Sequence, residues 1–200
     1  MASHIYEHAE FTLSTPKTEL LPEDIGYEVA FAGRSNAGKS SAINVLTRQK
    51  SLARISKTPG RTQHLVCFTM DEQSRIIDLP GYGYAKVPAK VKKQWQSMIE
   101  DYLIKRQSLR GIVLMMDCRH PMKPFDEQML EWQSHAQIPM HILLTKSDKL
   151  TRGPASAALL KIKKAVSQRD NVSAQLFSAT KRVGLEECYA VLDGWYEVAP

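Results

Sequence analysis

Apolar, β-rich runs alternate along this chain with stretches of helix-like periodicity. The first kind of run predicts strands, and the second predicts helices that pack against them. The predicted strands are Tyr27–Ala32, His64–Met70, Arg75–Leu79, Gly111–Asp117, His141–Thr145 and Ala174–Phe177. The predicted helices are Lys39–Arg48, Val91–Leu109, Phe125–Ala136, Pro154–Gln168 and Leu185–Val198.

This alternation predicts an α/β fold with a doubly wound, mostly parallel sheet and helices on both faces. Only residues 71–74 separate the second predicted strand from the third, and so short a link joins antiparallel strands. We therefore expect a mixed sheet. Residues 1–24 are polar and contain Pro16 and Pro22, which predicts an irregular N-terminal arm in front of one domain over residues 25–200.

The segment Gly33–Ser40 directly follows the first predicted strand and fits the pattern GxxxxGKS/T. Glycines let such a loop bend around an anion, and its N–H groups, with those of the next helix N-terminus, hold phosphate oxygens. We expect Lys39 to reach the β- and γ-phosphates and the Ser40 hydroxyl to ligate Mg²⁺. The expected phosphate-binding residues are Gly33, Arg34, Ser35, Asn36, Ala37, Gly38, Lys39, Ser40 and Ser41.

A second motif, DxxG, closes the strand Arg75–Leu79. A carboxylate such as Asp78 at a strand's C-terminal end can hold Mg²⁺ through water, and the Gly81 amide can sense a γ-phosphate. DxxG alone also fits an ordinary turn, so its place beside the phosphate loop decides between the two interpretations. The residues expected at this side of the site are Asp78, Leu79, Pro80 and Gly81.

Two further polar segments, Thr145–Asp148 and Ser178–Thr180, follow the last two predicted strands. All four motifs therefore lie at the sheet edge where doubly wound folds bind ligands. The Asp148 carboxylate can accept hydrogen bonds from N1–H and the exocyclic amine of guanine, donors that adenine does not present in that arrangement. The Lys146 stem can cover the base, and the Ala179 amide can donate to O6. The expected base-binding residues are Thr145, Lys146, Ser147, Asp148, Phe177, Ser178 and Ala179.

Net charge is +6, and the excess is local. A first basic group is opposed only by Glu100 and Asp101, and a second follows later in the chain. Such fields suit a polyanionic partner such as RNA, although a solvated helix face shows the same pattern. The first group is Lys86, Lys90, Lys92, Lys93, Lys105, Arg106 and Arg110; the second is Lys161, Lys163, Lys164 and Arg169.

Cysteines and apolar runs indicate the compartment. The three cysteines are far apart and form no CxxC pair, which favours reduced thiols in a cytoplasmic protein over a disulfide framework or a zinc site. The longest apolar run, Ile112–Met116, is far shorter than the roughly 20 residues of a membrane span. We therefore expect a cytoplasmic protein without a membrane partner.

Four stretches, Gly33–Ser40, Ser56–Gln63, Asp78–Tyr84 and Asp117–Pro121, resemble the bacterial EngB (YihA/YsxC) family of the TrmE–Era–EngA–EngB–septin-like group of Ras-like P-loop GTPases. The resemblance covers about residues 25–198. It implies a slow GTPase that binds GTP, GDP and Mg²⁺ and acts in assembly of the large ribosomal subunit. It also implies a monomer whose partners are ribosomal RNA and proteins, and not DNA. By the same resemblance, Thr62 is the switch I threonine that ligates Mg²⁺, and the nucleotide-contacting part of switch I is Gly60, Arg61, Thr62, Gln63 and His64.

Three positions depart from the Ras pattern. Tyr82 stands where Ras-type enzymes place the glutamine that orients water, which predicts slow hydrolysis. Asn36 stands where potassium-activated relatives have asparagine, so a K⁺ ion is expected to supply positive charge near the phosphates. Two alternatives are that Asn36 is only a turn residue and that Arg61 supplies the charge. Thr145 replaces the asparagine of NKxD, which bears on affinity rather than base identity. The residues predicted to act in catalysis are Lys39, Asn36 and Thr62.

Two other functions remain open. A P-loop kinase acting on a small molecule fits the phosphate loop but leaves Thr145–Asp148 and Ser178–Thr180 unexplained. A nucleotide-gated RNA or protein binding module with negligible turnover fits all the motifs and differs from a GTPase only in its rate.

Overall fold

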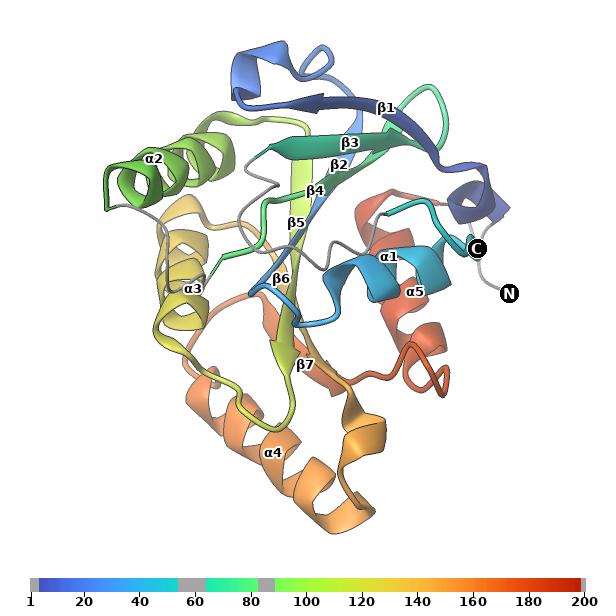
Figure 1. The fold of residues 1–200 in the computed structure, drawn as a ribbon, viewed down its shortest axis with the longest axis vertical. Helices are drawn as coiled ribbons and strands as arrows, with labels where there is room; N and C mark the ends of the chain where they lie inside the picture. Colours follow the sequence, from blue (N-terminus) through green and yellow to red (C-terminus); the bar gives the residue numbers. More distant parts are fainter. Residues whose placement is uncertain (1–3, 54–63, 83–88, 199–200) are drawn as a thin grey trace.

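The computed structural model describes residues 4–53, 64–82 and 89–198. Their strands form one sheet in the order β1-β3-β4-β2-β5-β6-β7 (Figure 1). The strands are β1 Glu10–Thr15, β2 Tyr27–Gly33, β3 Leu65–Thr69, β4 Ser74–Asp78, β5 Leu109–Asp117, β6 Met140–Thr145 and β7 Val172–Leu176. The helices are α1 Lys39–Leu46, α2 Ala89–Lys105, α3 Pro124–Ala136, α4 Arg152–Ala165 and α5 Leu185–Trp195, with short 3₁₀ turns η1 His4–His8, η2 Thr18–Leu20 and η3 Ser147–Lys149.

The sheet is mixed, as the short link between the second and third predicted strands indicates. β2 pairs in parallel with both β4 and β5, and β6 and β7 continue the parallel array. β3 is antiparallel to β4 and to the edge strand β1. The predicted mixed, mostly parallel sheet of an α/β fold is therefore confirmed.

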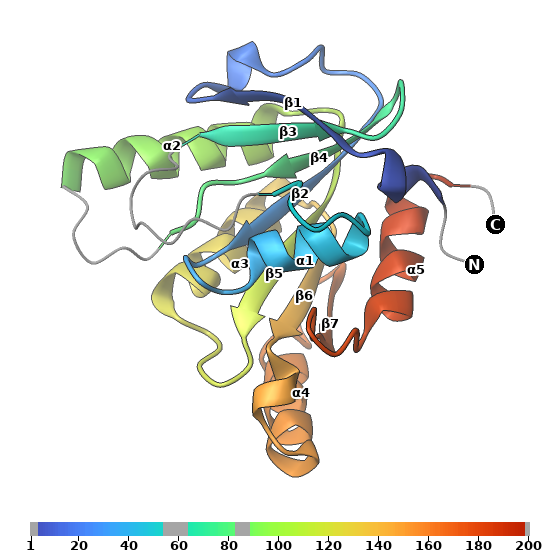
Figure 2. The same cartoon turned by 45° about the vertical axis from the view of Figure 1, so that its right-hand side comes forward.

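Helices cover both faces, and each face has its own core. Figure 2 shows α1 and α5 on one side of the sheet and α2 and α3 on the other. Along β2, Ala30 and Ala32 face the core that receives side chains of α2, α3 and α4. Val29 and Phe31 face the core of α1 and α5. β2 is thus a central strand with two apolar faces, which is typical of parallel sheets.

The prediction of an irregular N-terminal arm is wrong for residues 10–15. They form β1, which pairs with β3 from Glu10↔Thr69 to Thr15↔Leu65. A register shift lies between Phe11 and Leu13, and Phe11 is 59% exposed. Polar and apolar residues do alternate from Glu10 to Ser14, but this alternation is short and holds only two apolar side chains, so the polar composition of residues 1–24 outweighed it in the prediction.

An aromatic anchor precedes this strand. Tyr6 is buried and donates a hydrogen bond to Asp193 Oδ1 of α5 at 2.5 Å. Its ring packs against Tyr189 and Tyr196, with centroids 5.1 and 6.1 Å away. The N-terminal segment is therefore attached to α5 as well as to the sheet edge.

Several predicted boundaries move by a few residues. The predicted helix Val91–Leu109 ends at Lys105, because Leu109 already belongs to β5. The Ser108 carbonyl accepts a hydrogen bond from the Glu28 amide at 2.7 Å, which draws this segment to β2. Pairing with a neighbouring strand here outweighs the local helix pattern.

A buried carboxylate joins α2 to the sheet. Glu28 is fully buried and accepts hydrogen bonds from Arg106 at 2.6 and 2.9 Å and from Tyr102 at 3.2 Å. Arg75 lies 3.5 Å from the same carboxylate, and Asp24 lies 3.3 Å from Arg106. Arg106, counted above in the first basic group, is thus neutralised within the fold.

No helix within the described ranges is long and apolar enough to cross a bilayer.

We expect Arg106→Ala to lower the free energy of unfolding by about 3–5 kcal/mol, because it removes the main partner of a buried carboxylate. Lys105→Ala is the matched control, since Lys105 pairs with Asp101 on the exposed surface and should change stability little. Urea unfolding followed by circular dichroism measures both. Equal losses in the two variants contradict a structural role for the Glu28 cluster.

Candidate functional site

The segment Gly33–Ser40 forms the turn between β2 and α1. Gly38 has φ 95°, a conformation that residues with a Cβ rarely adopt, and it precedes the first turn of α1. A Cβ on Gly33 would lie 3.0 Å from the Met115 carbonyl oxygen of β5. Glycines therefore meet two requirements here: one allows the turn into the helix, and the other allows β2 and β5 to approach closely.

Lys39 and Asp78 form an ion pair across this turn. The pair brings the carboxylate at the end of β4 to the first turn of α1, where Ser40 follows Lys39. Burial raises the pKa of the Asp78 carboxyl, although the Lys39 ammonium acts in the opposite direction. A hydroxyl and a carboxylate are hard oxygen donors of the kind Mg²⁺ prefers, so Ser40 and Asp78 fit the predicted metal site.

The DxxG segment continues alongside the phosphate loop. The Ser35 amide donates a hydrogen bond to the Tyr82 carbonyl at 2.7 Å, and Arg34 and Tyr82 form a parallel bridge. A Cβ on Gly81 would lie 3.5 Å from the Ser35 backbone. Leu79 and Pro80 are buried between the strand and this contact. The sequence alone did not show whether DxxG lies beside the phosphate loop. Because Gly81 does lie there, the structure favours a role for it at the site over an ordinary turn.

The Tyr82 side chain points into the core. Its hydroxyl donates to Asp126 Oδ1 at 2.8 Å, and its ring lies 3.8 Å from the Phe125 ring, both at the start of α3. Burial and the neighbouring carboxylate raise the pKa of Tyr82 well above its usual value. A neutral phenol fixed in this way does not orient water as the glutamine of Ras-type enzymes does.

Thr145 connects the base side to the phosphate side. Its hydroxyl donates to the Ala37 carbonyl at 2.5 Å and lies 3.2 Å from the Met116 carbonyl. All three residues are buried. A hydroxyl at the end of β6 thus donates to the backbone of the phosphate loop. An asparagine side chain at this position could make more hydrogen bonds than this one hydroxyl.

Lys146 lies over the same loop. Its ammonium donates to the Asn36 carbonyl at 2.6 Å and pairs with Asp117 Oδ2 at 3.0 Å. Arg119 also bonds Asp117, at 2.7 and 2.9 Å. Burial acts to raise the pKa of Asp117, but the bonds from Arg119 and Lys146 outweigh it and lower the pKa. Asp117 therefore stays ionised and holds Lys146 beside the loop.

Asp148 and Ser178 meet although 30 positions separate them. The Ser178 hydroxyl donates to Asp148 Oδ1 at 2.6 Å, and this bond lowers the pKa of Asp148. The Ser147 amide donates to the Phe177 carbonyl at 3.2 Å, which joins the two segments again. Ala179 follows Ser178 and is half-buried. The carboxylate is thus ionised, fixed in direction and partly open, as recognition of two N–H donors requires.

The remaining predicted site residues are His64, Ser41 and the switch I residues. His64 stands at the start of β3, where Nδ1 lies 3.2 Å from the Ser14 hydroxyl of the edge strand. Ser41 is half-buried in α1. The switch I residues Gly60, Arg61, Thr62 and Gln63 lie outside the described residues.

Sequence reasoning gave no role to Asp117 or Arg119. The signal was present, because Asp117 ends β5 and pairs in register with Thr145 of β6. Together with Arg34, Asn36 and Lys146 they line a hollow of about 220 Å³ beside the phosphate loop. A polar residue at the end of each neighbouring parallel strand would have placed Asp117 at the site.

A family model described as 50S ribosome-binding GTPase matches residues 28–146 of this chain. The match includes the phosphate loop, the DxxG segment and Lys146. Asp148 and Ser178 lie beyond it, so their assignment rests on the geometry above.

Solved structures share the fold. A probable GTP-binding protein engB is 23% identical over 86% of this chain and 100% of that chain, with a TM-score of 0.68. Era in complex with MgGDPNP and nucleotides 1506–1542 of 16S ribosomal RNA is 24% identical over 86% of this chain and 57% of that chain, with a TM-score of 0.64. An Aquifex aeolicus Era variant bound to GDP and aluminium fluoride is 21% identical over 84% and 56%, with a TM-score of 0.63. This chain therefore spans little more than half of the Era chains.

We expect Asp148→Asn to weaken guanine-nucleotide binding by about 1.5–3 kcal/mol and to favour xanthine nucleotides, because the amide no longer accepts two bonds from guanine. Thr145→Val is the matched variant. It leaves the Ala37 carbonyl without the hydroxyl and should lower affinity without changing base preference. Calorimetric titration with GDP, ADP and XDP separates the two effects. An unmutated protein that binds ADP and GDP equally contradicts the base assignment.

Proposed function

The chain belongs to the family of 50S ribosome-binding GTPases, and from this membership we propose that it is a slow GTPase switch of the EngB type that acts in assembly of the large ribosomal subunit. The family match supports GTP binding and hydrolysis. The subunit, the assembly role, the slow rate and a cytoplasmic location belong to the proposal.

The observation that carries the proposal is the convergence of four segments on one sheet edge. The phosphate side is joined to the base side by the bond from Thr145 to the Ala37 carbonyl. The base side ends in the Asp148–Ser178 pair. One ligand that has both phosphates and a guanine base uses all of these groups, whereas a small-molecule kinase has no use for the Asp148–Ser178 pair.

Each group has a defined task in hydrolysis. Lys39 binds the β- and γ-phosphate oxygens, and loop amides at the N-terminus of α1 hold the remaining phosphate oxygens. The Ser35 and Ala37 amides are not among them, because they donate to the Tyr82 and Arg34 carbonyls. Ser40, Asp78 and, by resemblance, Thr62 hold Mg²⁺, which supplies positive charge to those oxygens when bound. Lys39 exchanges its bond with Asp78 for the phosphates, so phosphate binding and release of that carboxylate are coupled.

The Tyr82 geometry supports a slow intrinsic rate. The side chain after DxxG is bonded to Asp126 and packed on Phe125, and so positions no water. Assistance then comes from a partner or from a cation near the phosphates. An arginine finger supplied by a partner raises kcat by about 10³–10⁵ in other GTPases.

Asn36 is the residue of this chain that we propose to hold the cation that assists hydrolysis. It has φ 63°, a left-handed conformation that asparagine tolerates better than most residues, and it is exposed at the loop surface. The Lys146 ammonium already occupies its carbonyl oxygen. Its side-chain amide is the group proposed to hold K⁺ against the phosphates, and a turn asparagine without K⁺ remains the alternative.

The switch surface is proposed to include residues 86–102, which follow DxxG along the chain. Trp95 is packed against Phe125 and Tyr82, with centroids 4.6 and 5.9 Å away, so its ring belongs to the core. A change at Gly81 therefore reaches α2 through Tyr82. Lys93 is exposed on this helix, and the side chains of Lys86, Lys90 and Lys92 lie outside the described residues.

We expect the protein to sediment with large-subunit particles more strongly with a GTP analogue than with GDP. Reversing Lys86, Lys90, Lys92 and Lys93 to glutamate should weaken this binding and reduce its salt dependence, because fewer counterions are released. Lys39→Ala tests the nucleotide requirement in the same assay. Sedimentation that is unchanged by the charge reversal refutes this surface. Turnover that stays negligible even with particles favours the binding-module alternative.

We expect KCl to stimulate GTP turnover relative to NaCl, because a bound K⁺ supplies positive charge near the bridging oxygen. Asn36→Ala should erase the difference between the two salts. Arg61→Ala is the control for an arginine in cis. Equal turnover in both salts, together with loss of turnover in Arg61→Ala, assigns the charge to Arg61 instead.

A further inference from the structure

The segment from Lys149 to Arg169 contains no acidic residue. Its cations are Lys149, Arg152, Lys161, Lys163, Lys164 and Arg169. It includes all of α4, which lies at the end of the molecule that carries the C-terminal ends of the strands (Figure 1). The local charge is therefore cationic over a whole helix and the turn that follows.

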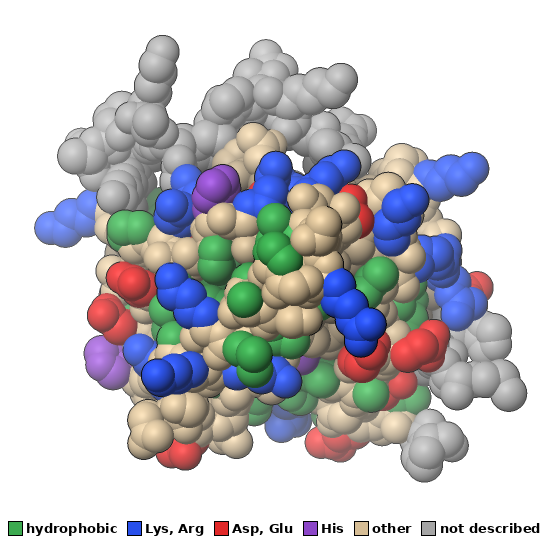
Figure 3. Space-filling view, turned by 90° about the horizontal axis from the view of Figure 1, so that it is seen from below, with side chains coloured by type: hydrophobic (Ala, Val, Ile, Leu, Met, Phe, Trp, Pro, Cys, Tyr) green, Lys and Arg blue, Asp and Glu red, His purple; other side chains and the backbone are tan. Residues whose placement is uncertain are grey.

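One face of α4 packs on the sheet, and the other is open. Ala155 and Ile162 are its buried residues, and Leu160 is 67% exposed on the outer side. Lys161, Lys163 and Lys164 are all exposed. Figure 3 shows this end of the molecule with Lys and Arg side chains spread over it and apolar side chains between them. The face is thus open, cationic and not needed to hold the helix.

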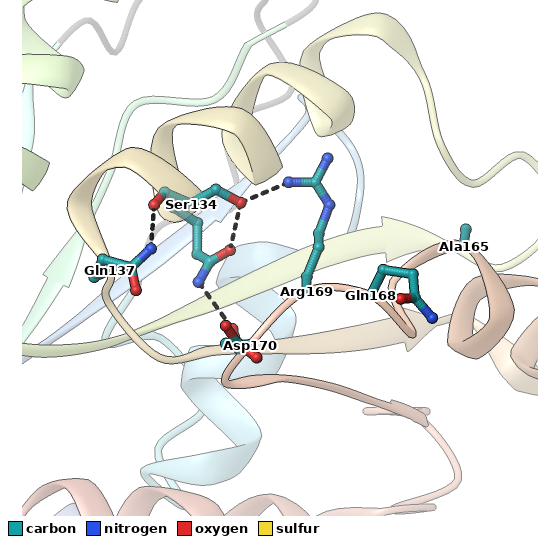
Figure 4. Close-up of a pocket in the computed structure, with 7 residues that line it drawn as sticks. Ser134, Gln137, Ala165, Gln168, Arg169 and Asp170 are labelled. Carbon is teal, nitrogen blue, oxygen red and sulfur yellow. Dashed lines mark hydrogen bonds between the residues drawn. The ribbon is translucent and has the colours of Figure 1, made fainter.

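A polar pocket of about 440 Å³ adjoins the C-terminal end of α4. Figure 4 shows side chains of α3 on one side and of the end of α4 and its turn on the other. Its lining residues are Gln133, Ser134, Gln137, Ala165, Gln168, Arg169 and Asp170. A volume of this size lies within the range of small-ligand sites.

The pocket and the cationic helix form one surface. Ala165 lines the pocket, Lys164 precedes it, and Lys161 lies one helical turn before it on the same face. Arg169 is held in the pocket wall, because Nη1 donates to the Leu130 carbonyl at 2.9 Å and to the Ser134 hydroxyl at 2.7 Å. Asp170 is the one acidic residue among the lining residues.

We propose that the cations of α4 and the adjoining pocket bind the phosphate backbone and a nucleotide of ribosomal RNA. The inference rests on the proposed function, since it assigns the RNA contact of that ribosome-binding protein. Lysines on an open helix pair with phosphates, and a guanidinium held by α3 presents a fixed cation at the pocket. The exposed Gln168 and the amide oxygen of the exposed Gln137 offer groups that suit base edges and 2′-hydroxyls. Gln133 is buried, and its amide bonds the Ile138 and Asp170 carbonyls, so it shapes the pocket wall.

The chemistry of the pocket favours RNA over the other polyanions. A lipid surface requires a broad apolar face beside the cations, whereas Leu160 is the one large apolar side chain that α4 exposes among its lysines. The pocket is lined mainly by amides and a hydroxyl, groups that hydrogen-bond rather than enter a bilayer.

The proposed contact does not depend on the γ-phosphate, which distinguishes GTP from GDP. α4 packs on β7 at one side of the sheet, whereas Asp78 and Gly81 follow β4 on the other side of β2. It differs in this respect from the proposed surface on α2, which directly follows DxxG.

The test compares two pairs of charge reversals. Lys161→Glu with Lys164→Glu alters the proposed surface. Lys17→Glu with Lys50→Glu alters exposed lysines elsewhere and changes the net charge by the same amount. Lys161→Gln with Lys164→Gln avoids placing acidic side chains at a helix C-terminus, in case the first pair destabilises α4. Binding to transcribed large-subunit ribosomal RNA is measured at several salt concentrations with GDP and with a GTP analogue.

We expect the α4 glutamate pair to weaken RNA binding at least about tenfold, with the salt slope reduced by about two. The glutamine pair should reduce the slope similarly, and the control pair should have little effect. The loss should be equal in both nucleotide states, and nucleotide affinity should be unchanged. Equal losses in the α4 and control pairs, or a loss confined to the GTP state, overturn the inference.

Two further arms identify the partner. Phosphatidylglycerol vesicles and ribosomal proteins freed of RNA should bind all variants alike. A lysine-dependent loss in either arm, without one for RNA, overturns the inference.

An unmutated protein that neither hydrolyses GTP nor sediments with particles refutes the proposed function. An unmutated protein that does both, with α4 variants that bind RNA normally, refutes only the α4 surface.

Discussion

The parallel pairing of β2 with β4 on one side and with β5 on the other sets the position of every group at the candidate site. The register places Phe31 opposite Asp78 and Gly33 opposite Met115, so β4 ends within two residues of the point where the phosphate loop leaves β2. β5 and β6 continue this arrangement, with Asp117 opposite Thr145. A shift in either pairing of β2 would separate Lys39 from Asp78 and the loop from its supports.

The phosphate and base sides are also coupled through the loop itself. Its carbonyl oxygens at Ala37 and Asn36 accept from Thr145 and Lys146, the first two residues of the base segment. A base that displaces or covers Lys146 therefore affects the loop that holds the phosphates. The Thr145 hydrogen bond is buried, so its loss would leave the Ala37 carbonyl without a partner. The free-energy cost of an unpaired buried carbonyl exceeds the net contribution of a typical hydrogen bond to stability.

The cationic residues fall into two classes, those paired with buried carboxylates and those exposed to solvent, and the net charge counts both alike. Arg75 and Arg106 neutralise the buried Glu28 and join α2 to β2, so they belong to the folded core. The lysines of α4 have no such partner within the described residues and face solvent. The cationic surface available to a polyanion is therefore smaller than the composition indicates, and the lysines of α4 belong to it.

The sequence by itself determined the fold class and the order of the strands from β2 onward and of the helices, and it predicted the four candidate site segments, because these depend on local periodicity and on motifs of fixed spacing. Tertiary structure decided the rest. β1 became a strand only by pairing with β3, since its own pattern is weak. Asp117 was brought to Lys146, Tyr82 to Asp126 and Asp148 to Ser178 by the packing of elements distant in the chain. Spacing along the chain does not encode contacts of this kind, because they depend on which strands lie side by side and on where each one ends.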